Sequence, residues 1–170
     1  MEDEVDGLVA AWRAERPDLD VAPLQVLSRV SRLSRHLERA RQHVFSAHDL
    51  EAWEFDVLTA LRRAGEPYRL SPGRLLRATL VTSGTMTNRI DRLAAAGLVE
   101  RHPDPQDKRG VQVQLTSKGK NLVDDTMSDL LDREHELLDG LSPADQGRLA
   151  DLLRTLLIPF DTTPDGRKAG

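Results

Sequence analysis

The stretch "TSGTMTNRIDRLAAAGLVERH", residues 82–102, places short polar side chains where a surface helix usually carries Glu and Lys. Its apolar side chains recur at helical spacing and predict one buried face: Met86, Ile90, Leu93 and Ala94. Three polar residues fall on the opposite face: Thr85, Asn88 and Arg92. Thr and Asn are poor helix formers, so their use on an exposed face indicates contact with something other than water. Arg89 lies at the margin of the two faces and can reach inward or outward.

The segments before this stretch are also predicted to be helical. The sequences "PLQVLSRVSRLSRHLERARQHVF" and "HDLEAWEFDVLTALRRAG" repeat apolar residues every three or four positions. In the second of them, Asp49 is a candidate N-cap and Gly65 a stop signal. The next segment, "SPGRLLRATL", offers Ser71 as N-cap and Pro72 at the first helical position. A short break around residues 80 and 81 then precedes the opening helix, for which Thr82 or Ser83 is the predicted cap.

After Gly97 the pattern changes from helix to strand. Leu98–Arg101 and Val111–Leu115 alternate apolar and polar residues, which predicts two short strands. The loop "HPDPQDKRG" between them is rich in Pro, Asp and Gly and predicts a hairpin. Helical spacing returns from Leu122, and "SPAD" predicts a last helix capped by Ser142.

A short helix, a tight break, a second helix and a two-stranded hairpin follow one another in the order of a winged helix-turn-helix. We therefore predict a mainly α fold with a small β-hairpin wing (α+β). The predicted divisions are an N-terminal extra helix or arm over 1–20, long helical segments over 21–48 and 117–160, a winged helix-turn-helix lobe over 49–116, and a disordered tail over 161–170.

Composition and charge restrict the class of protein. Residues 71–120 hold nine Lys or Arg against four Asp or Glu, a local charge of +5 on a chain of net charge −4. A basic segment on an acidic body suits local contact with a polyanion. The chain has no Cys, no apolar run long enough to span a membrane and no signal-peptide pattern, so we expect a cytoplasmic protein.

The residues that enzymes and metal sites require are missing from the pattern. The five His have no metal-ligand spacing except His43 and His48, which are poorly aligned on a helix. No Gly-rich phosphate loop and no Ser-His-Asp order is present. We therefore predict neither catalysis, nor a metal site, nor a cofactor.

The opening helix and the hairpin tip are predicted to contact double-stranded DNA. A helix fits the major groove, where base edges are distinguishable, and a cationic tip fits a narrow minor groove. The candidate DNA contacts are Ser83, Thr85, Thr87, Asn88 and Arg92 on the helix, and Lys108 and Arg109 at the tip. Three alternatives stay open: a polar helix face without a ligand, a solvated turn, and a winged helix that contacts another protein and binds no DNA.

With these residues in view, the chain resembles the MarR family of winged-helix regulators over residues 22–160. The resemblance is carried by "TSGTMTNRIDRLAAAGLVER" and by "DPQDKRGVQVQLTSKGK", which is similar to the family's wing signature. It implies an obligate homodimer, joined by the segments 21–48 and 117–160, on a near-palindromic operator. It also implies a repressor, because most members of the family repress transcription. Many members dissociate from DNA when a small anionic or phenolic ligand binds.

A narrower resemblance concerns the urate-responsive, PecS-like subgroup. That subgroup carries an extra N-terminal helix with a Trp, an Asp before the helix-turn-helix, an Arg in the recognition helix and an Arg on the first wing strand. The matching residues here are Trp12, Asp56, Arg89 and Arg101. The resemblance implies that they bind urate or another anion, with Asp56 holding Arg89 in the free state. Structural roles for all four residues, and small carboxylates as the ligand, remain alternatives.

Overall fold

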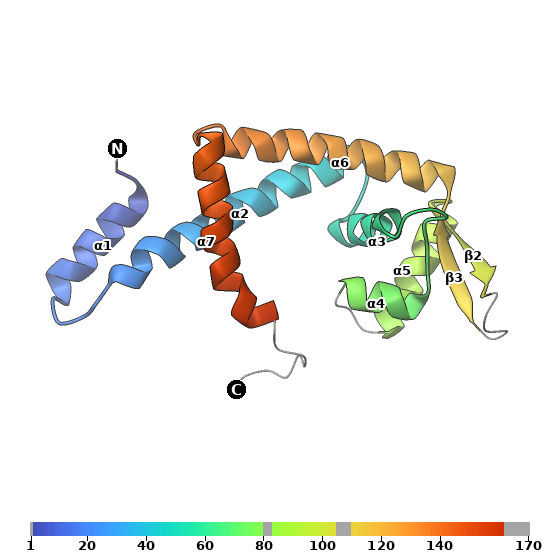
Figure 1. Ribbon diagram of the computed structural model, residues 1–170, viewed down its shortest axis with the longest axis horizontal. Coiled ribbons are helices and arrows are strands. Elements are labelled where there is room, and N and C mark those ends of the chain that lie inside the picture. The colour runs from blue at the N-terminus through green and yellow to red at the C-terminus, as the bar shows by residue number, and fades with distance from the viewer. Residues whose placement is uncertain (1, 80–82, 105–109, 162–170) are drawn as a thin grey trace. The chain divides into compact units, whose positions relative to one another are not determined.

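The helix predicted in the opening stretch lies beside two short helices and a small sheet in the computed structural model, which describes residues 2–79, 83–104 and 110–161 (Figure 1). The elements are α1 (Glu4–Glu15), α2 (Ala22–Ala47), α3 (Ala52–Arg63), β1 (Arg69–Leu70), α4 (Pro72–Thr79), α5 (Ser83–Ala95), β2 (Val99–Pro103), β3 (Val111–Leu115), α6 (Ser117–Leu138) and α7 (Pro143–Asp161). They form two compact units, one up to residue 133 and one from residue 134. This order confirms the predicted mainly α fold with a wing.

The predicted boundary signals of α3 agree with the structure at one end and differ at the other. Asp49 is not the N-cap of α3, so that prediction was wrong: its φ of 53° places it in the turn after α2. The N-cap is Glu51 instead. Its backbone is extended, and its N–H donates to the Glu54 carboxylate at 2.9 Å. Gly65 ends the helix as predicted, because its φ of 75° is one that glycine adopts without strain.

The start of α4 also agrees with the sequence. The Ser71 hydroxyl accepts the Arg74 backbone N–H at 3.4 Å, and Pro72 occupies the first helical position. The predicted break at residues 80 and 81, and the cap at Thr82 or Ser83, lie outside the described residues or side chains. Where α5 ends, Gly97 has a φ of 70° and the Leu98 N–H donates to the Leu93 carbonyl at 2.9 Å.

The wing is a three-stranded antiparallel sheet in the order β1-β3-β2. The predicted hairpin is confirmed, with Val99 opposite Leu115 and Pro103 opposite Val111. The sequence did not predict β1, which pairs Arg69 with Gln114. A strand of two residues is too short to show an alternating pattern, so only its pairing with β3 identifies it.

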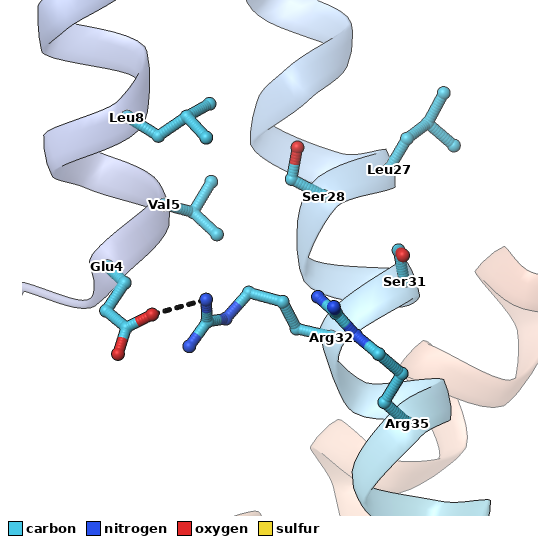
Figure 2. Close-up of a pocket in the computed structure, with 8 residues that line it drawn as sticks. All are labelled: Glu4, Val5, Leu8, Leu27, Ser28, Ser31, Arg32 and Arg35. Carbon is cyan, nitrogen blue, oxygen red and sulfur yellow. Dashed lines mark ion pairs between the residues drawn. The ribbon is translucent and has the colours of Figure 1, made fainter.

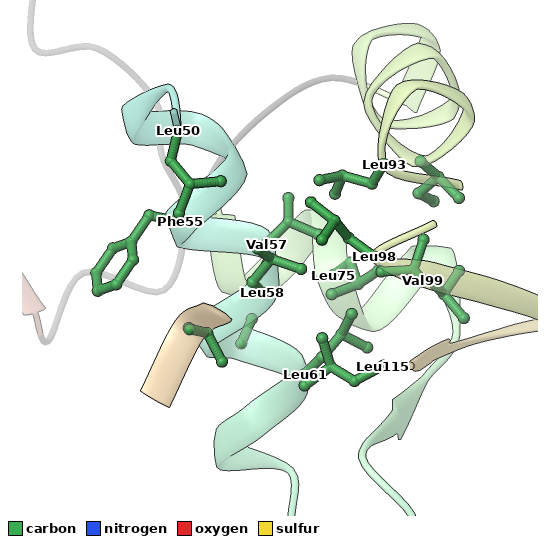
Figure 3. Packing of buried hydrophobic residues seen from close by; sticks show 14 of the residues in the cluster. Leu50, Phe55, Val57, Leu58, Leu61, Leu75, Leu93, Leu98, Val99 and Leu115 are labelled. Carbon is green, nitrogen blue, oxygen red and sulfur yellow. The ribbon is translucent and has the colours of Figure 1, made fainter. Parts of the chain in front are cut away.

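One hydrophobic core joins α3, α4, α5 and the wing (Figure 3). Leu58, Leu61, Leu75 and Leu93 have no exposed surface, and burying each such side chain stabilises the fold by roughly 1.5–3 kcal/mol. The predicted inner face of α5 is confirmed, since Met86 and Ile90 are 1% exposed. The core therefore fixes which face of α5 points outward.

A close backbone contact joins α6 to the wing. The Thr116 hydroxyl donates to the Gly97 carbonyl at 2.8 Å and accepts the Gly119 N–H at 3.0 Å, which caps the first turn of α6. A Cβ atom on Gly119 would lie 2.1 Å from the Leu98 carbonyl oxygen. This geometry leaves no room for a side chain at position 119.

Charged groups tie the end of α3 to α6. Arg62 donates to the Asp124 carboxylate at 2.7 Å, and Lys120 donates to the same carboxylate at 3.1 Å. The Arg62 guanidinium also lies 4.9 Å from the centre of the Tyr68 ring. Arg62, and then Lys120, hold the pKa of the Asp124 carboxyl below its ordinary value of 3.8, so this group is ionised at neutral pH.

The last helix, α7, is exposed along most of its described length. Ser142 and Asp145 cap it as predicted: the Asp145 N–H donates to the Ser142 hydroxyl at 3.2 Å. None of its described residues is buried. Five large apolar side chains are at least half exposed: Leu152, Leu156, Leu157, Ile158 and Phe160. No described helix has the length and the apolar content that crossing a membrane requires.

Candidate nucleic-acid interface

The outward face of α5 carries the side chains that the sequence predicted there. Thr85, Thr87, Asn88 and Arg92 are exposed, and Arg89 is half-buried at the margin. The Ser83 side chain lies outside what the structure describes, as do Lys108 and Arg109 at the wing tip. Short hydroxyls, an amide and guanidinium groups thus share one side of a helix whose other side is seated in the core.

Four residues from α5 and the start of α3 form the Trp53 cluster: Glu51, Trp53, Arg89 and Arg92. The guanidinium carbons of Arg89 and Arg92 lie 5.1 Å and 4.8 Å from the centre of the Trp53 ring, within cation–π distance. The Trp53 indole N–H donates to Glu51 Oε2 at 2.8 Å, and Arg92 Nη2 donates to Glu51 Oε1 at 2.5 Å. The recognition helix is therefore held to α3 by an aromatic ring and a carboxylate.

The Glu51 carboxylate is charged over the physiological range. Arg92, and then the Trp53 indole N–H, hold the pKa of its carboxyl below the ordinary value of 4.5. The Arg92–Glu51 pair is more than half exposed on both sides, at 54% and 56% of the two side chains. An ion pair this open to solvent contributes little to the stability of the fold, so its main effect is to orient the two side chains.

A second ion pair connects α5 to the wing. Arg101 Nη2 on β2 lies 2.7 Å from Asp91 Oδ1 on α5, and both side chains are partly exposed. The subgroup resemblance implied a ligand role for Arg101; in the structure Arg101 pairs with Asp91 on α5. An anion that bound Arg101 would compete with Asp91 and act on α5 directly.

The structure does not bring the four predicted ligand residues into one site. Asp56 is exposed on α3, and among the described residues no ion pair joins its carboxylate to Arg89. Trp12 is 47% exposed on α1. It lines a shallow hollow made of residues of α1 alone: Leu8, Ala11, Trp12 and Glu15. Arg89 contacts Trp53 instead.

Within the segment 1–20, residues Glu4–Glu15 form the helix α1, which packs on α2. Val5, Val9 and Val21 are buried together, and Arg29 pairs with Asp3 and Asp6 at 2.8 Å each. Beside this contact lies an open hollow of about 350 Å³. Figure 2 shows Val5 and Leu8 facing α2 across the hollow, and Arg32 reaching over to its ion-pair partner Glu4.

Sequence reasoning missed Glu51 and Trp53 as parts of this interface. Trp53 fits the apolar repeat of α3, although it is partly exposed and packs against the edge of the core. The available signal was a Glu two residues before a Trp at a helix start, upstream of a helix with Arg three positions apart. That signal is weak because the two segments are 41 residues apart in the chain.

Comparison with known proteins agrees with this geometry. Residues 48–110 match the model of the MarR family. The chain is 41% identical over 150 residues to the HTH-type transcriptional regulator PecS of Dickeya dadantii, covering 88% of this chain and 90% of that protein. It is similar to a mutant MarR from Escherichia coli complexed with operator DNA, with a TM-score of 0.66, 31% identity and coverage of 81% and 95%.

A third relative is regulated by a small molecule. Bordetella bronchiseptica BpsR, solved to explain how 6-hydroxynicotinic acid regulates its DNA binding, matches with a TM-score of 0.64 and 30% identity, covering 77% of this chain and 91% of that one. Regulators of this family are not enzymes, in agreement with the prediction from the sequence. The chain therefore belongs to the MarR family and is a DNA-binding transcriptional regulator of the winged helix-turn-helix type.

Proposed function

We propose that this regulator acts as a homodimeric repressor, which binds a near-palindromic operator and is released from it by a small anionic ligand. The observation that carries the proposal is the outward face of α5. Polar and cationic side chains face solvent there while Met86, Ile90 and Leu93 hold the helix in the core. A rigid helix with such a face suits the major groove, where direct contacts read base edges.

Each DNA contact has a chemical reason. The Asn88 amide can donate to and accept from one adenine edge, and the Arg92 guanidinium suits guanine or a phosphate. The hydroxyls of Ser83, Thr85 and Thr87 suit phosphate oxygens, which position the helix without reading sequence. Lys108 and Arg109 at the wing tip are assigned to the minor groove or the flanking phosphates.

Dimer formation is proposed from apolar surface that a single chain leaves uncovered. The five exposed apolar side chains of α7 lie in one unit of the chain, and α2 exposes a second set at helical spacing: Val26, Leu27, Val30 and Leu33. Apolar helix faces of this kind are buried in obligate dimers. Two-fold symmetry then sets the two half-sites about one helical turn apart.

The effector is proposed to be a small planar anion such as urate or an aromatic carboxylate. Cationic side chains on α5 and β2 support this class: Arg89 has a guanidinium beside an aromatic ring, and Arg101 contacts α5 through Asp91. BpsR, whose DNA binding 6-hydroxynicotinic acid regulates, is a relative of similar architecture. Trp12, Asp56, Arg89 and Arg101 stay the candidate ligand-binding residues by resemblance, and the Arg89 and Arg101 contacts support the set, whereas in the single chain the four do not line one site. An anion bound at Arg89 acts on the helix that reads DNA, and this links the two equilibria.

Fluorescence anisotropy of a labelled duplex from upstream of the regulator's own gene tests this proposal. Wild-type protein is expected to prefer that duplex over random DNA, and urate or 6-hydroxynicotinate is expected to weaken operator binding by about tenfold, a coupling of about 1.4 kcal/mol. Asp56→Asn is expected to blunt the response. Asp20→Asn, which removes a carboxylate of the α1–α2 loop, is the control.

Two results would count against parts of the proposal. If no anion weakens operator binding, the repressor part of the proposal stands and the effector part is rejected. A wild-type response in Asp56→Asn would take that residue out of the ligand mechanism.

A further inference from the structure

We propose that Glu51 is a positioning residue for DNA recognition: it holds the Arg92 guanidinium on the Trp53 ring, so that Arg92 reads a base edge instead of pairing with any phosphate nearby. This inference rests on the proposed function, because it takes α5 as the element that enters the major groove. It adds to that function a residue outside α5 and the wing that determines sequence preference.

Both oxygens of the Glu51 carboxylate are engaged. Oε2 accepts the Trp53 indole N–H at 2.8 Å, and Oε1 accepts Arg92 Nη2–H at 2.5 Å. The indole therefore orients the carboxylate, and the carboxylate orients the guanidinium. Trp53 itself packs against the core, so this chain of contacts is anchored in the rigid part of the molecule.

The Arg92 guanidinium remains able to bind DNA while it is held. A carboxylate oxygen takes one of its N–H groups, and the ring lies 4.8 Å from its central carbon. The side chain is still 54% exposed, which leaves other N–H donors of the fork available. A guanidinium fixed in this way can make the bidentate contact with guanine that carries sequence information.

The energetic effect of Glu51 should appear in specificity and hardly in stability. The exposed Arg92–Glu51 pair is a weak stabilising contact. A free arginine, however, loses rotamer entropy when it is fixed on DNA, and a held one loses less. The carboxylate also offsets one positive charge, which weakens binding to phosphates of any sequence.

Arg89 makes the need for Glu51 stronger. Its guanidinium lies 5.1 Å from the same ring, so two cations share one aromatic side chain. Among the described residues no carboxylate forms an ion pair with Arg89, and its charge also stabilises ionised Glu51. Without the Glu51 charge, repulsion between the two guanidinium groups favours a conformation in which Arg92 leaves the ring.

The test compares Glu51→Gln with wild type on two duplexes, one enriched by wild-type protein from a randomised library and one a shuffled sequence of the same composition. We expect operator affinity to fall about threefold to tenfold, since a guanine contact is loosened. Affinity for the shuffled duplex should rise, and the slope of its log affinity against log salt should steepen by about 0.9, the value for one additional phosphate contact. Glu15→Gln on α1 makes the same charge change and should alter neither quantity.

Arg92→Lys is the second variant. It keeps the positive charge and removes the planar fork, so it should lose the same operator preference without steepening the salt slope. If Glu51 acts through Arg92, the double variant should lose little more preference than either single variant, as a double-mutant cycle reports. Thermal unfolding midpoints should stay within a few degrees of wild type for all of them, which separates positioning from loss of fold.

The outcomes separate the two levels of the proposal. If Glu51→Gln keeps both the full preference for the enriched duplex and the wild-type salt slope, the positioning role is overturned while the repressor stands. Additive losses in the double variant would also overturn it. If wild-type protein enriches no sequence at all, the proposed function fails and the role of Glu51 fails with it.

Discussion

Replacing Gly119 by alanine is expected to lower the free energy of unfolding by about 3 kcal/mol, at the upper end of the cost of overpacking. The added Cβ would lie 2.1 Å from the Leu98 carbonyl oxygen and 3.2 Å from a Leu115 side-chain carbon. Neither the strand nor the helix can yield easily, because Thr116 binds the Gly97 carbonyl and caps α6 at the same point. The whole junction between α6 and the wing must shift.

Denaturant unfolding followed by circular dichroism measures this effect. Gly7→Ala is the matched control: it is also a glycine inside a helix, but its added Cβ meets nothing within 4 Å. That variant should be unchanged or more stable by up to about 1 kcal/mol, since alanine is the better helix former. All variants are compared at one protein concentration, because the unfolding of the proposed dimer would depend on it. Equal stabilities for the two variants would contradict the close contact at Gly119.

The second large effect is expected when charged residues replace two exposed leucines of α7. The double variant Leu152→Asp/Leu156→Asp should give a monomer by light scattering and lose at least about a hundredfold in operator affinity, because two half-sites are then no longer bound by one molecule. Both leucines are at least half exposed in the single chain, at 65% and 50%. In a dimer that buries them, two carboxylates would be desolvated without partners.

A control variant with the same charge change distinguishes loss of the dimer interface from repulsion between DNA and added negative charge. Arg154→Glu also lowers the net charge by two, and at about 100° per residue it lies roughly 160° around the helix from both leucines. Its loss of the Asp151 contact is a surface effect and should cost little. A dimeric double variant with wild-type DNA affinity would exclude this face of α7 from the interface.

Periodicity and capping chemistry predicted most of the fold because they act over a few residues. The inner face of α5 could be derived from the spacing of Met86, Ile90 and Leu93, and all three are buried. The start of α4 could be derived from Ser71 and Pro72. Local signals failed at the start of α3, where two residues could each act as the N-cap. Asp49 is a good capping residue, but the chain turns through a positive φ there and α3 begins after Glu51.

The candidate site was less predictable because its contacts depend on tertiary structure. The exposure of Asn88 and the marginal place of Arg89 follow from helical geometry alone. The pairing of Arg92 with Glu51, and of Arg101 with Asp91, requires knowing how α3 and β2 pack on α5. Side-chain spacing within one helix carries no such information, so the Trp53 cluster was found only in three dimensions.

Enrichment of DNA from a randomised duplex library by the wild-type protein, followed by anisotropy at several salt concentrations, tests the central claim most directly. We predict one near-palindromic sequence with half-sites about one helical turn apart. Its affinity should exceed that of shuffled DNA by about a thousandfold or more and should fall steeply with salt. Failure to enrich any sequence, with no binding to either duplex even at low salt, would contradict the assignment of α5 as a reading helix.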